Sequence, residues 1–261
     1  MNAPMIEITA LTAGYKGTSV LRDITLSVRA GEFTGILGPN GSGKTTLIRA
    51  LSGVLPASSG MIRIAGHDIS GLPAKARARQ CATVAQKNPG LAGVRALSLV
   101  LMGRYPYVSF LGGYSARDHL RARESMAETS CLALGQRPTE ALSGGELQRV
   151  IMAKALAQDT SLLLLDEAAS NLDVARTMDL YELLKAKNAS GLTVLTVAHD
   201  LNLAALYCQR LVFLKNGSVA ADGPTREIFT SQTLSEIYET HLAVAAHPLT
   251  GAPQAYLVPR A

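Results

Sequence analysis

The chain begins with short apolar and β-branched runs, each followed by a turn that contains glycine. The segments MIEITALTAGY, LRDITLSV and FTGIL have this character, and the last leads directly into a glycine-rich loop and a helix-like segment. Runs of this kind, bounded by glycine turns, predict strands. Two further short strands are predicted at residues 60–69 and 81–86. The first third of the chain is therefore expected to be rich in strands.

Two later runs are apolar at almost every position. They are SLLLLDE (161–167) and LTVLTVAHD (192–200). Continuous apolar runs of this length are typical of parallel strands covered on both faces of a sheet. Helix-length segments lie between the strands, so we predict an α/β fold with crossover helices.

Two other segments change the pattern. Between residues 88 and 139 the β-branched runs disappear and helical spacing takes over, which predicts a helical insertion. Residues 210–223 are predicted to form a hairpin that turns at Asn216-Gly217.

Composition narrows the function classes. Of 261 residues, 48% are hydrophobic, as in an ordinary globular protein. The net charge of +5 is mild and its Lys and Arg are scattered, which favours solubility and nucleotide binding over nucleic-acid binding. Cys81, Cys131 and Cys208 form no CxxC pair, and we expect buried thiols in a reducing compartment. No signal peptide is recognised and no apolar run reaches membrane-spanning length, so we expect a protein that is soluble or peripheral to a membrane.

The segment GPNGSGKT satisfies the phosphate-loop pattern Gly-x4-Gly-Lys-Thr. It follows an apolar strand and precedes a helical segment, which is where the pattern is informative. Glycines allow backbone N–H groups to surround phosphate oxygens, and the helix N-terminus adds partial positive charge. Lys44 is predicted to reach the β- and γ-phosphates of a nucleotide, and Thr45 to ligate Mg²⁺. The alternative is a glycine-rich turn with an exposed lysine.

Two acidic residues end the apolar run LLLLDE. Asp166 is predicted to hold Mg²⁺, directly or through water, and Glu167 to act as the general base for the attacking water. The alternative is a charge pair at a helix N-terminus.

His199 and Gln86 also follow predicted strands. Because strand carboxyl ends converge on ligands in such sheets, His199 is predicted to contact the γ-phosphate. The Gln86 amide is predicted to reach the metal or the water. A structural histidine and a surface glutamine are the alternatives.

With these residues assembled, the chain resembles the ATP-binding subunits of ABC transporters over almost its whole length. The motifs occur in the family's order: Tyr15, the phosphate loop at 38–46, Gln86, LSGGE at 142–146, LLLLDE, SNLD at 170–173, and His199. The resemblance implies a P-loop NTPase cassette with a RecA-like core, an antiparallel β subdomain and an inserted α-helical subdomain. Residues 1–87 and 160–261 would form the core with the β subdomain, and residues 88–159 the helical subdomain with LSGGE.

The resemblance also implies a role for each matching residue. Tyr15 would stack on adenine, and Asp173 would lie at a subunit junction. Ser143, Gly144, Gly145 and Glu146 would face the γ-phosphate held by a second subunit, where a helix N-terminus and close backbone approach favour an anion. Taken alone, the segment ALSGGELQRV (141–150) is also compatible with a glycine turn that caps an ordinary helix. The complete nucleotide loop is Gly38, Pro39, Asn40, Gly41, Ser42, Gly43, Lys44, Thr45 and Thr46.

One position departs from the family. Proline commonly follows the glutamate, and Ala168 stands there in this chain. The turn is then less rigid, but no reacting group is lost, so ATP hydrolysis is still expected.

The cargo is suggested by weaker signals. Tyr105, Tyr107, Phe110 and Tyr114 cluster as at a protein interface, although packing explains them nearly as well. The segments 101–108 and 243–259, the latter a predicted strand, turn and strand, resemble ATPases of importers of ferric siderophores, haem and cobalamin.

The resemblance therefore implies a head-to-tail homodimer sharing two ATP sites. This dimer would dock on two permease subunits at the cytoplasmic face of the membrane and be served indirectly by a substrate-binding protein. Alternatives are an ABC exporter or other ABC transporter ATPase, and a soluble ABC ATPase. The last predicts tandem cassettes or a long coiled coil, and the chain shows neither.

Overall fold

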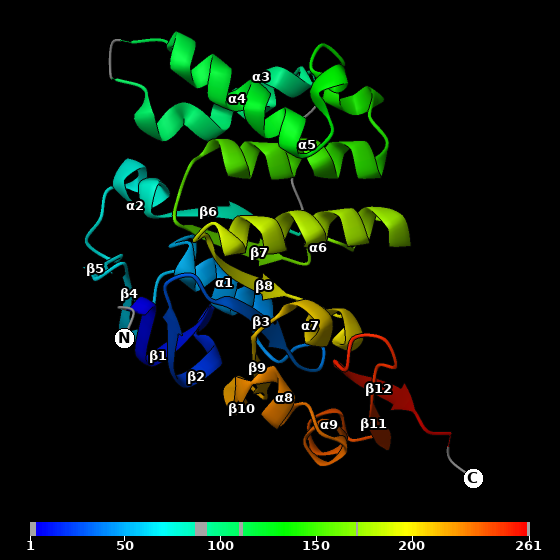
Figure 1. Cartoon of the computed structure of the whole chain (residues 1–261). Coiled ribbons are helices and arrows are strands. Elements are labelled where there is room, and N and C mark those ends of the chain that lie inside the picture. The colour runs from blue at the N-terminus through cyan, green and yellow to red at the C-terminus, as the bar shows by residue number, and fades with distance from the viewer. Residues whose placement is uncertain (1–3, 87–92, 110–111, 171, 260–261) are drawn as a thin grey trace. The chain divides into compact units, whose positions relative to one another are not determined.

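The computed structural model describes residues 4–86, 93–109, 112–170 and 172–259 (Figure 1). It divides into two compact units, residues 1–71 with 193–261 and residues 72–192. The subdomain boundaries predicted from the sequence, after residue 87 and before residue 160, stay a prediction. Among the described residues, no helix combines the length and apolar character needed to cross a membrane.

The first unit begins with an antiparallel sheet. Its strands, in the order β2-β1-β4-β5, are β1 Pro4–Tyr15, β2 Thr18–Arg29, β4 Ser59–Ile64 and β5 His67–Asp68. In β2 the side chains of Ile24, Leu26 and Val28 are buried at every second position, because alternate residues of a strand point to one face.

The sequence predicted a single strand at residues 60–69, and this was wrong in one respect. Residues Ala65 and Gly66 both have positive φ (48° and 80°), so the chain reverses there and forms the hairpin β4–β5.

A second group of strands in this unit is mainly parallel. The order is β10-β9-β3-β8, with β3 Phe33–Leu37, β8 Thr193–Val197, β9 Arg210–Lys215 and β10 Ser218–Pro224. All residues of β3 and β8 are buried, and for β8 this confirms the prediction of a strand covered on both faces. The β9–β10 hairpin turns at Asn216-Gly217, both with positive φ, which confirms that prediction.

The remaining elements of the first unit are helices and a C-terminal hairpin. They are α1 Lys44–Leu51, α7 Leu201–Tyr207, α8 Thr225–Ile228, α9 Ser231–Tyr238, β11 Leu242–Ala246 and β12 Pro253–Leu257. The strands β11 and β12 pair antiparallel, so the predicted strand, turn and strand at residues 243–259 is confirmed.

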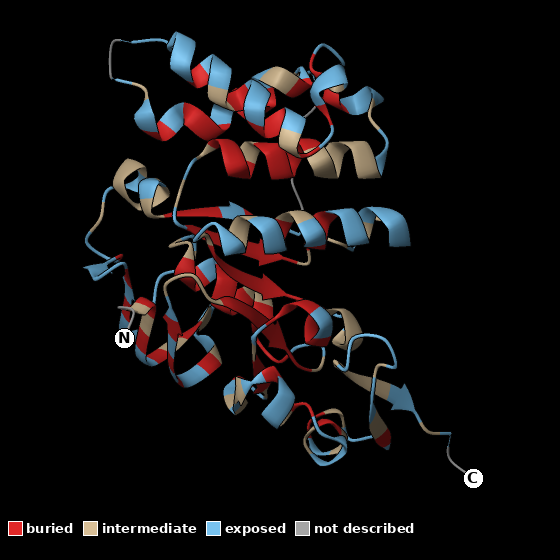
Figure 2. Cartoon of the chain, in the orientation of Figure 1, coloured by how far each residue is buried: buried red, intermediate tan, exposed pale blue. Residues whose placement is uncertain are grey.

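The second unit is largely helical and contains two parallel strands. Its elements are α2 Ala74–Gln80, β6 Cys81–Val84, α3 Ala96–Leu101, η1 Met102–Tyr107, α4 Ala116–Glu128, η2 Leu132–Leu134, η3 Thr139–Ala141, α5 Gly144–Ala157, β7 Leu162–Asp166 and α6 Val174–Ala189. Figure 1 shows α3, α4 and α5 packed together, and their inward faces are buried in Figure 2.

The helix after LSGGE has an apolar face that packs in the interior of the unit. Val150, Ile151 and Ala155 of α5 are buried, and Leu147 packs against the cluster formed by α3, α4 and α5.

The three cysteines, Cys81, Cys131 and Cys208, are buried, as predicted. Burial raises the pKa of the Cys81 thiol to about 11, which keeps it protonated and unreactive at neutral pH.

A buried ion pair joins three elements of the second unit. Arg104 of η1 lies 2.9 Å from the carboxylate of Asp118 on α4, with side chains 8% and 10% exposed. The same guanidinium donates to the carbonyl of Ala157 at 2.8 Å. The Ser115 hydroxyl, and after it Arg104, hold the pKa of Asp118 down to about 2.

Removing this carboxylate should destabilise the fold, because Arg104 would keep a buried charge without its partner. For Asp118→Asn we expect a loss of about 3 kcal/mol in the free energy of unfolding. Urea unfolding at pH 7 measures it. The matched control is Asp179→Asn, whose pair with Arg176 is 67% and 49% exposed and should contribute less than about 1 kcal/mol.

The difference between wild type and Asp118→Asn should also depend on pH. Because the folded pKa is depressed, the stabilisation is complete above the unfolded pKa of about 3.9 and is lost as pH falls toward 2. Equal stability of the two proteins at pH 7 would contradict the role given to this pair.

Candidate functional site

The phosphate loop joins β3 to α1 in the first unit, and its glycines are required by the backbone. Gly38 has φ 141°, and a Cβ there would lie 2.0 Å from the carbonyl oxygen of Leu214. Gly43 has φ 104°, and its Cβ would lie 2.7 Å from a methyl group of Leu21. A side chain at either position would force the loop out of this shape.

Lys44 and Ser42 give this loop the chemistry of a phosphate site. The Lys44 side chain is only 6% exposed, and its Nζ donates to the carbonyls of Gly38 and Pro39 at 2.8 and 2.9 Å. Among the described residues, the buried Ser42 Oγ has no hydrogen-bond partner. A buried ammonium, an unused hydroxyl and the start of α1 all suit an anion, so the residues fit a nucleotide phosphate.

Tyr15 lies in the same unit at the end of β1. Its ring is 40% exposed, and its hydroxyl accepts from Arg49 of α1 at 3.0 Å. The Arg49 guanidinium lies 5.9 Å from the ring centroid. The predicted adenine-stacking residue is thus connected to the helix that follows the phosphate loop.

His199 leaves the sheet at the same edge as the phosphate loop. Strands β3 and β8 are parallel neighbours, with Ile36 opposite Val197, and the N–H of Ala198 donates to the carbonyl of Ile36 at 3.2 Å. The side chain of His199 is exposed there. Within the first unit the structure therefore brings the phosphate loop and His199 to one edge.

In the second unit, β6 and β7 place Gln86, Asp166 and Glu167 at one edge. The strands are parallel, with Val84 opposite Leu165, and Asp166 at the end of β7 is 3% exposed. The Gln86 amide donates to the Glu167 carboxylate at 2.5 Å. The residues of this unit that were predicted to bind the metal and the attacking water are thus neighbours. Gln86 is exposed, and it is hydrogen-bonded to the predicted base.

Ser143 begins α5 as its N-cap. Its hydroxyl accepts from the N–H of Glu146 at 3.3 Å, and the Glu146 carboxylate accepts from the N–H of Ser143 at 2.8 Å. These bonds, together with Arg137 at 2.8 Å, lower the pKa of Glu146. Gly144 is exposed and Gly145 half-buried. In a single chain, LSGGE is therefore a capping box, and its contact with a second subunit's phosphate stays a prediction.

Asp173 also caps a helix. Its carboxylate accepts from the N–H of Arg176 at 2.8 Å and so begins α6. Its place at a subunit junction stays a prediction, and Asn171 of the same SNLD motif lies outside the described residues.

The tyrosine cluster is tied to basic residues of the second unit. The Lys75 ammonium lies 4.7 Å from the Tyr105 ring centroid, and the Tyr107 ring has Arg79 at 5.4 Å and Arg104 at 4.1 Å. Tyr105 is 58% exposed, whereas Phe110 lies outside the described residues.

Two polar residues near these groups were not predicted. Tyr238 of α9 accepts the N–H of Gly38 at 3.1 Å, and Gln148 of α5 donates to the carbonyl of Ala168 at 2.7 Å. Both side chains act on backbone groups of residues far away along the chain. No local pattern marks such contacts.

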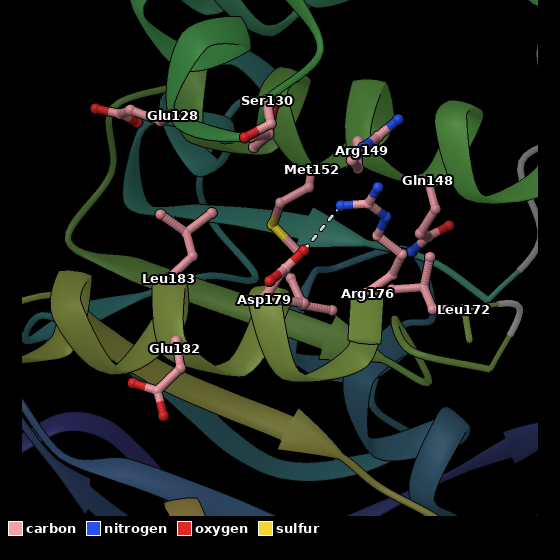
Figure 3. Close-up of a pocket in the computed structure, with 12 residues that line it drawn as sticks. Glu128, Ser130, Gln148, Arg149, Met152, Leu172, Arg176, Asp179, Glu182 and Leu183 are labelled. Carbon is pink, nitrogen blue, oxygen red and sulfur yellow. Dashed lines mark hydrogen bonds and ion pairs between the residues drawn. The ribbon is translucent and has the colours of Figure 1, made fainter. Parts of the chain in front are cut away.

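A cavity of about 310 Å³ also lies in the second unit between α5 and α6 (Figure 3). It is lined by Glu128, Thr129, Ser130, Gln148, Arg149, Met152, Leu172, Arg176, Asp179, Leu180, Glu182 and Leu183. None of the residues predicted for the nucleotide site lines it.

Sequence comparison establishes the family. The profile of the ABC transporter family matches residues 21–170, which is more than half of the chain. The chain belongs to the ABC transporter family, and it is an ATPase cassette of that family.

Several relatives are named as ATP-binding proteins of import or transport. The hemin import ATP-binding protein HmuV of Streptomyces coelicolor is 38% identical over 94% of this chain and 89% of its own length. The ferric enterobactin transport ATP-binding protein FepC of Escherichia coli is 34% identical over 93% and 90%. The cobalamin import ATP-binding protein BtuD of Halobacterium salinarum is 36% identical over 95% of this chain. The chain spans only 57% to 62% of the length of BtuD and some other relatives.

Solved structures confirm the predicted fold. A metal-chelate type ABC transporter in an inward-facing conformation matches 99% of this chain and 98% of its own, with a TM-score of 0.85 and 23% identity. A bacterial ABC transporter cassette solved as a dimer matches 85% and 99%, with a TM-score of 0.77 and 29% identity.

Replacing Tyr238 by Phe should weaken the phosphate loop. The variant leaves the N–H of Gly38 without its acceptor, and we expect a loss of about 1 kcal/mol in the free energy of unfolding and weaker binding of a fluorescent ATP analogue. Burial raises the pKa of Tyr238 to about 12, so the hydroxyl is protonated under assay conditions. The control is Tyr256→Phe on the exposed C-terminal hairpin, which should change neither quantity. Identical behaviour of both variants would remove Tyr238 from the site.

Proposed function

We propose that this chain hydrolyses ATP to power uptake of a metal chelate, such as haem, a ferric siderophore or cobalamin, through membrane permease partners. The observation that carries the ATP-binding part is the phosphate loop, with Lys44 buried against the loop's own carbonyls. The names of its relatives support the cargo class.

In this proposal, the first unit binds the nucleotide. Lys44 exchanges the carbonyls of Gly38 and Pro39 for phosphate oxygens, and Ser42 and the loop N–H groups add further donors. The exposed ring of Tyr15 supplies a face for the adenine. Mg²⁺, when bound, neutralises phosphate charge; the Thr45 hydroxyl and the Asp166 carboxylate are oxygen ligands of the type it prefers.

The second unit supplies the base. Glu167 accepts a proton from the attacking water, and Gln86 holds its carboxylate in place. His199 contacts the γ-phosphate. In the dimer, Ser143, Gly144 and Gly145 of one copy complete the site of another.

Glu167→Gln should lower kcat by more than about a hundredfold, because the amide cannot take a proton, while ATP binding is retained. Phosphate release and equilibrium ATP binding measure the two effects. The matched control is Glu182→Gln on α6, which should keep wild-type turnover. Normal turnover in Glu167→Gln would remove it as the base.

The cargo is tested with the complex purified together with its permeases in proteoliposomes. Haem, a ferric siderophore or cobalamin should raise the rate of phosphate release by wild type and leave Glu167→Gln unaffected. Stimulation by none of these chelates would contradict the importer proposal and leave the ATPase proposal standing.

Ser143→Arg should block ATP-driven dimerisation, because a long cation replaces the small hydroxyl at the shared site. Sedimentation with ATP measures the dimer, and nucleotide binding by the monomer should stay nearly unchanged. Since the change also removes a helix cap, the control is Ser115→Arg, which removes the capping box of α4 and should still dimerise. If Ser143→Arg still forms the dimer with ATP, Ser143 is not part of an ATP site shared between two copies.

A further inference from the structure

The backbone at Glu167 has a conformation that its surroundings must hold. Its φ is 55°, in the left-handed region that a non-glycine residue rarely adopts. Such a conformation persists only where neighbouring contacts restrain it. Gln86 restrains the carboxylate, but a second contact is needed for the main chain.

That contact comes from α5. Gln148 Nε2 donates to the carbonyl oxygen of Ala168, the residue directly after Glu167, at 2.7 Å. The N–H of Ser170 donates to the carbonyl of Glu167 at 3.1 Å and closes the turn locally. Of these two bonds, the one from Gln148 ties the turn to a separate element.

Gln148 is well placed to act as a rigid support. It lies in the second turn of α5, just after the capping box of Ser143 and Glu146, and on a helix that is largely buried from Val150 onward. Figure 3 shows its side chain beside Leu172 at one end of the cavity between α5 and α6. Gln148 lines this cavity, and its hydrogen bond to Ala168 joins the side chain to the turn.

Ala168 makes this bond more important. Proline at this position would fix its own φ, whereas alanine has no ring that holds this angle. The side chain of Ala168 is buried, but a methyl group cannot orient the carbonyl. The direction of that carbonyl, and with it the setting of Glu167, then depends on the donor from Gln148.

We propose that Gln148 is a positioning residue for Glu167 in ATP hydrolysis. This inference rests on the proposed function, since Glu167 must be the base. Gln86 fixes the carboxylate and Gln148 fixes the backbone, so the base is held from two elements. A small misplacement of a reacting group can cost about a hundredfold in rate.

The test compares Gln148 with Gln158, the C-cap residue directly after α5, in the full chain. Gln148→Met keeps the length of the side chain and removes the donor. Gln158→Met is the matched control, because Gln158 donates to the carbonyl of Cys81 at 2.8 Å, at the other end of α5. Steady-state Mg-ATP hydrolysis, equilibrium ATP binding and Tm are measured for both variants.

We expect Gln148→Met to lower kcat by about tenfold to a hundredfold with KM and ATP binding within about twofold of wild type. Gln158→Met should lower Tm by a similar amount and keep kcat. If Gln148→Met does not fold, Gln148→Asn, which is polar and too short to reach Ala168, should show the same loss of kcat.

Two results would overturn the inference: a kcat within about twofold of wild type in the Gln148 variant, or an equal loss of kcat in Gln158→Met. Either would leave the proposed function intact. A wild-type chain without Mg-ATP hydrolysis would instead contradict the proposed function itself.

Discussion

Parallel pairing of fully buried strands is the constraint on which the candidate site depends. Strands β3, β7 and β8 are buried along their whole length, so reactive side chains become accessible only where each strand leaves its sheet. Parallel neighbours end at the same edge. In the first unit this places the phosphate loop beside His199, and in the second it places Gln86 beside Glu167. The direction of the strands therefore determines which reactive side chains lie near one another.

At those strand ends the backbone has positive φ angles, which most residue types rarely adopt. Gly38 can turn sharply because it has no side chain, whereas Glu167 has a positive φ and a full side chain. Glycine itself permits the positive φ at residue 38, whereas contacts with other residues must stabilise the positive φ of Glu167. Tyr238 and Gln148 play comparable roles in the two units, since each makes a hydrogen bond to a backbone group that follows a buried strand. Tyr238 accepts from the N–H of Gly38, and Gln148 donates to the carbonyl of Ala168.

These differences explain what could be predicted from sequence. Periodicity and glycine position predicted most of the strands and the Asn216-Gly217 hairpin, because these depend on near neighbours in the chain. The turn at Ala65-Gly66 was missed because alanine is not a usual residue at positive φ. Tyr238 and Gln148 were missed for another reason: their partners lie 200 and 20 residues away, and a lone tyrosine or glutamine has no pattern. The family motifs identified the site residues, but the hydrogen bond between Gln86 and Glu167 is seen only in the structure.

The capping box at LSGGE bears on stoichiometry. In a single chain the Glu146 carboxylate already bonds the start of α5, and Arg137 is paired with that carboxylate. An anion arriving at this helix therefore meets a partly neutralised N-terminus and no free cation from these residues, so Ser143 and its glycines are a weak phosphate site by themselves. They become useful only where the phosphate charge is balanced from elsewhere. A buried lysine such as Lys44 in a second copy of the chain provides that charge, which favours a shared site in a dimer over a second independent site in the monomer.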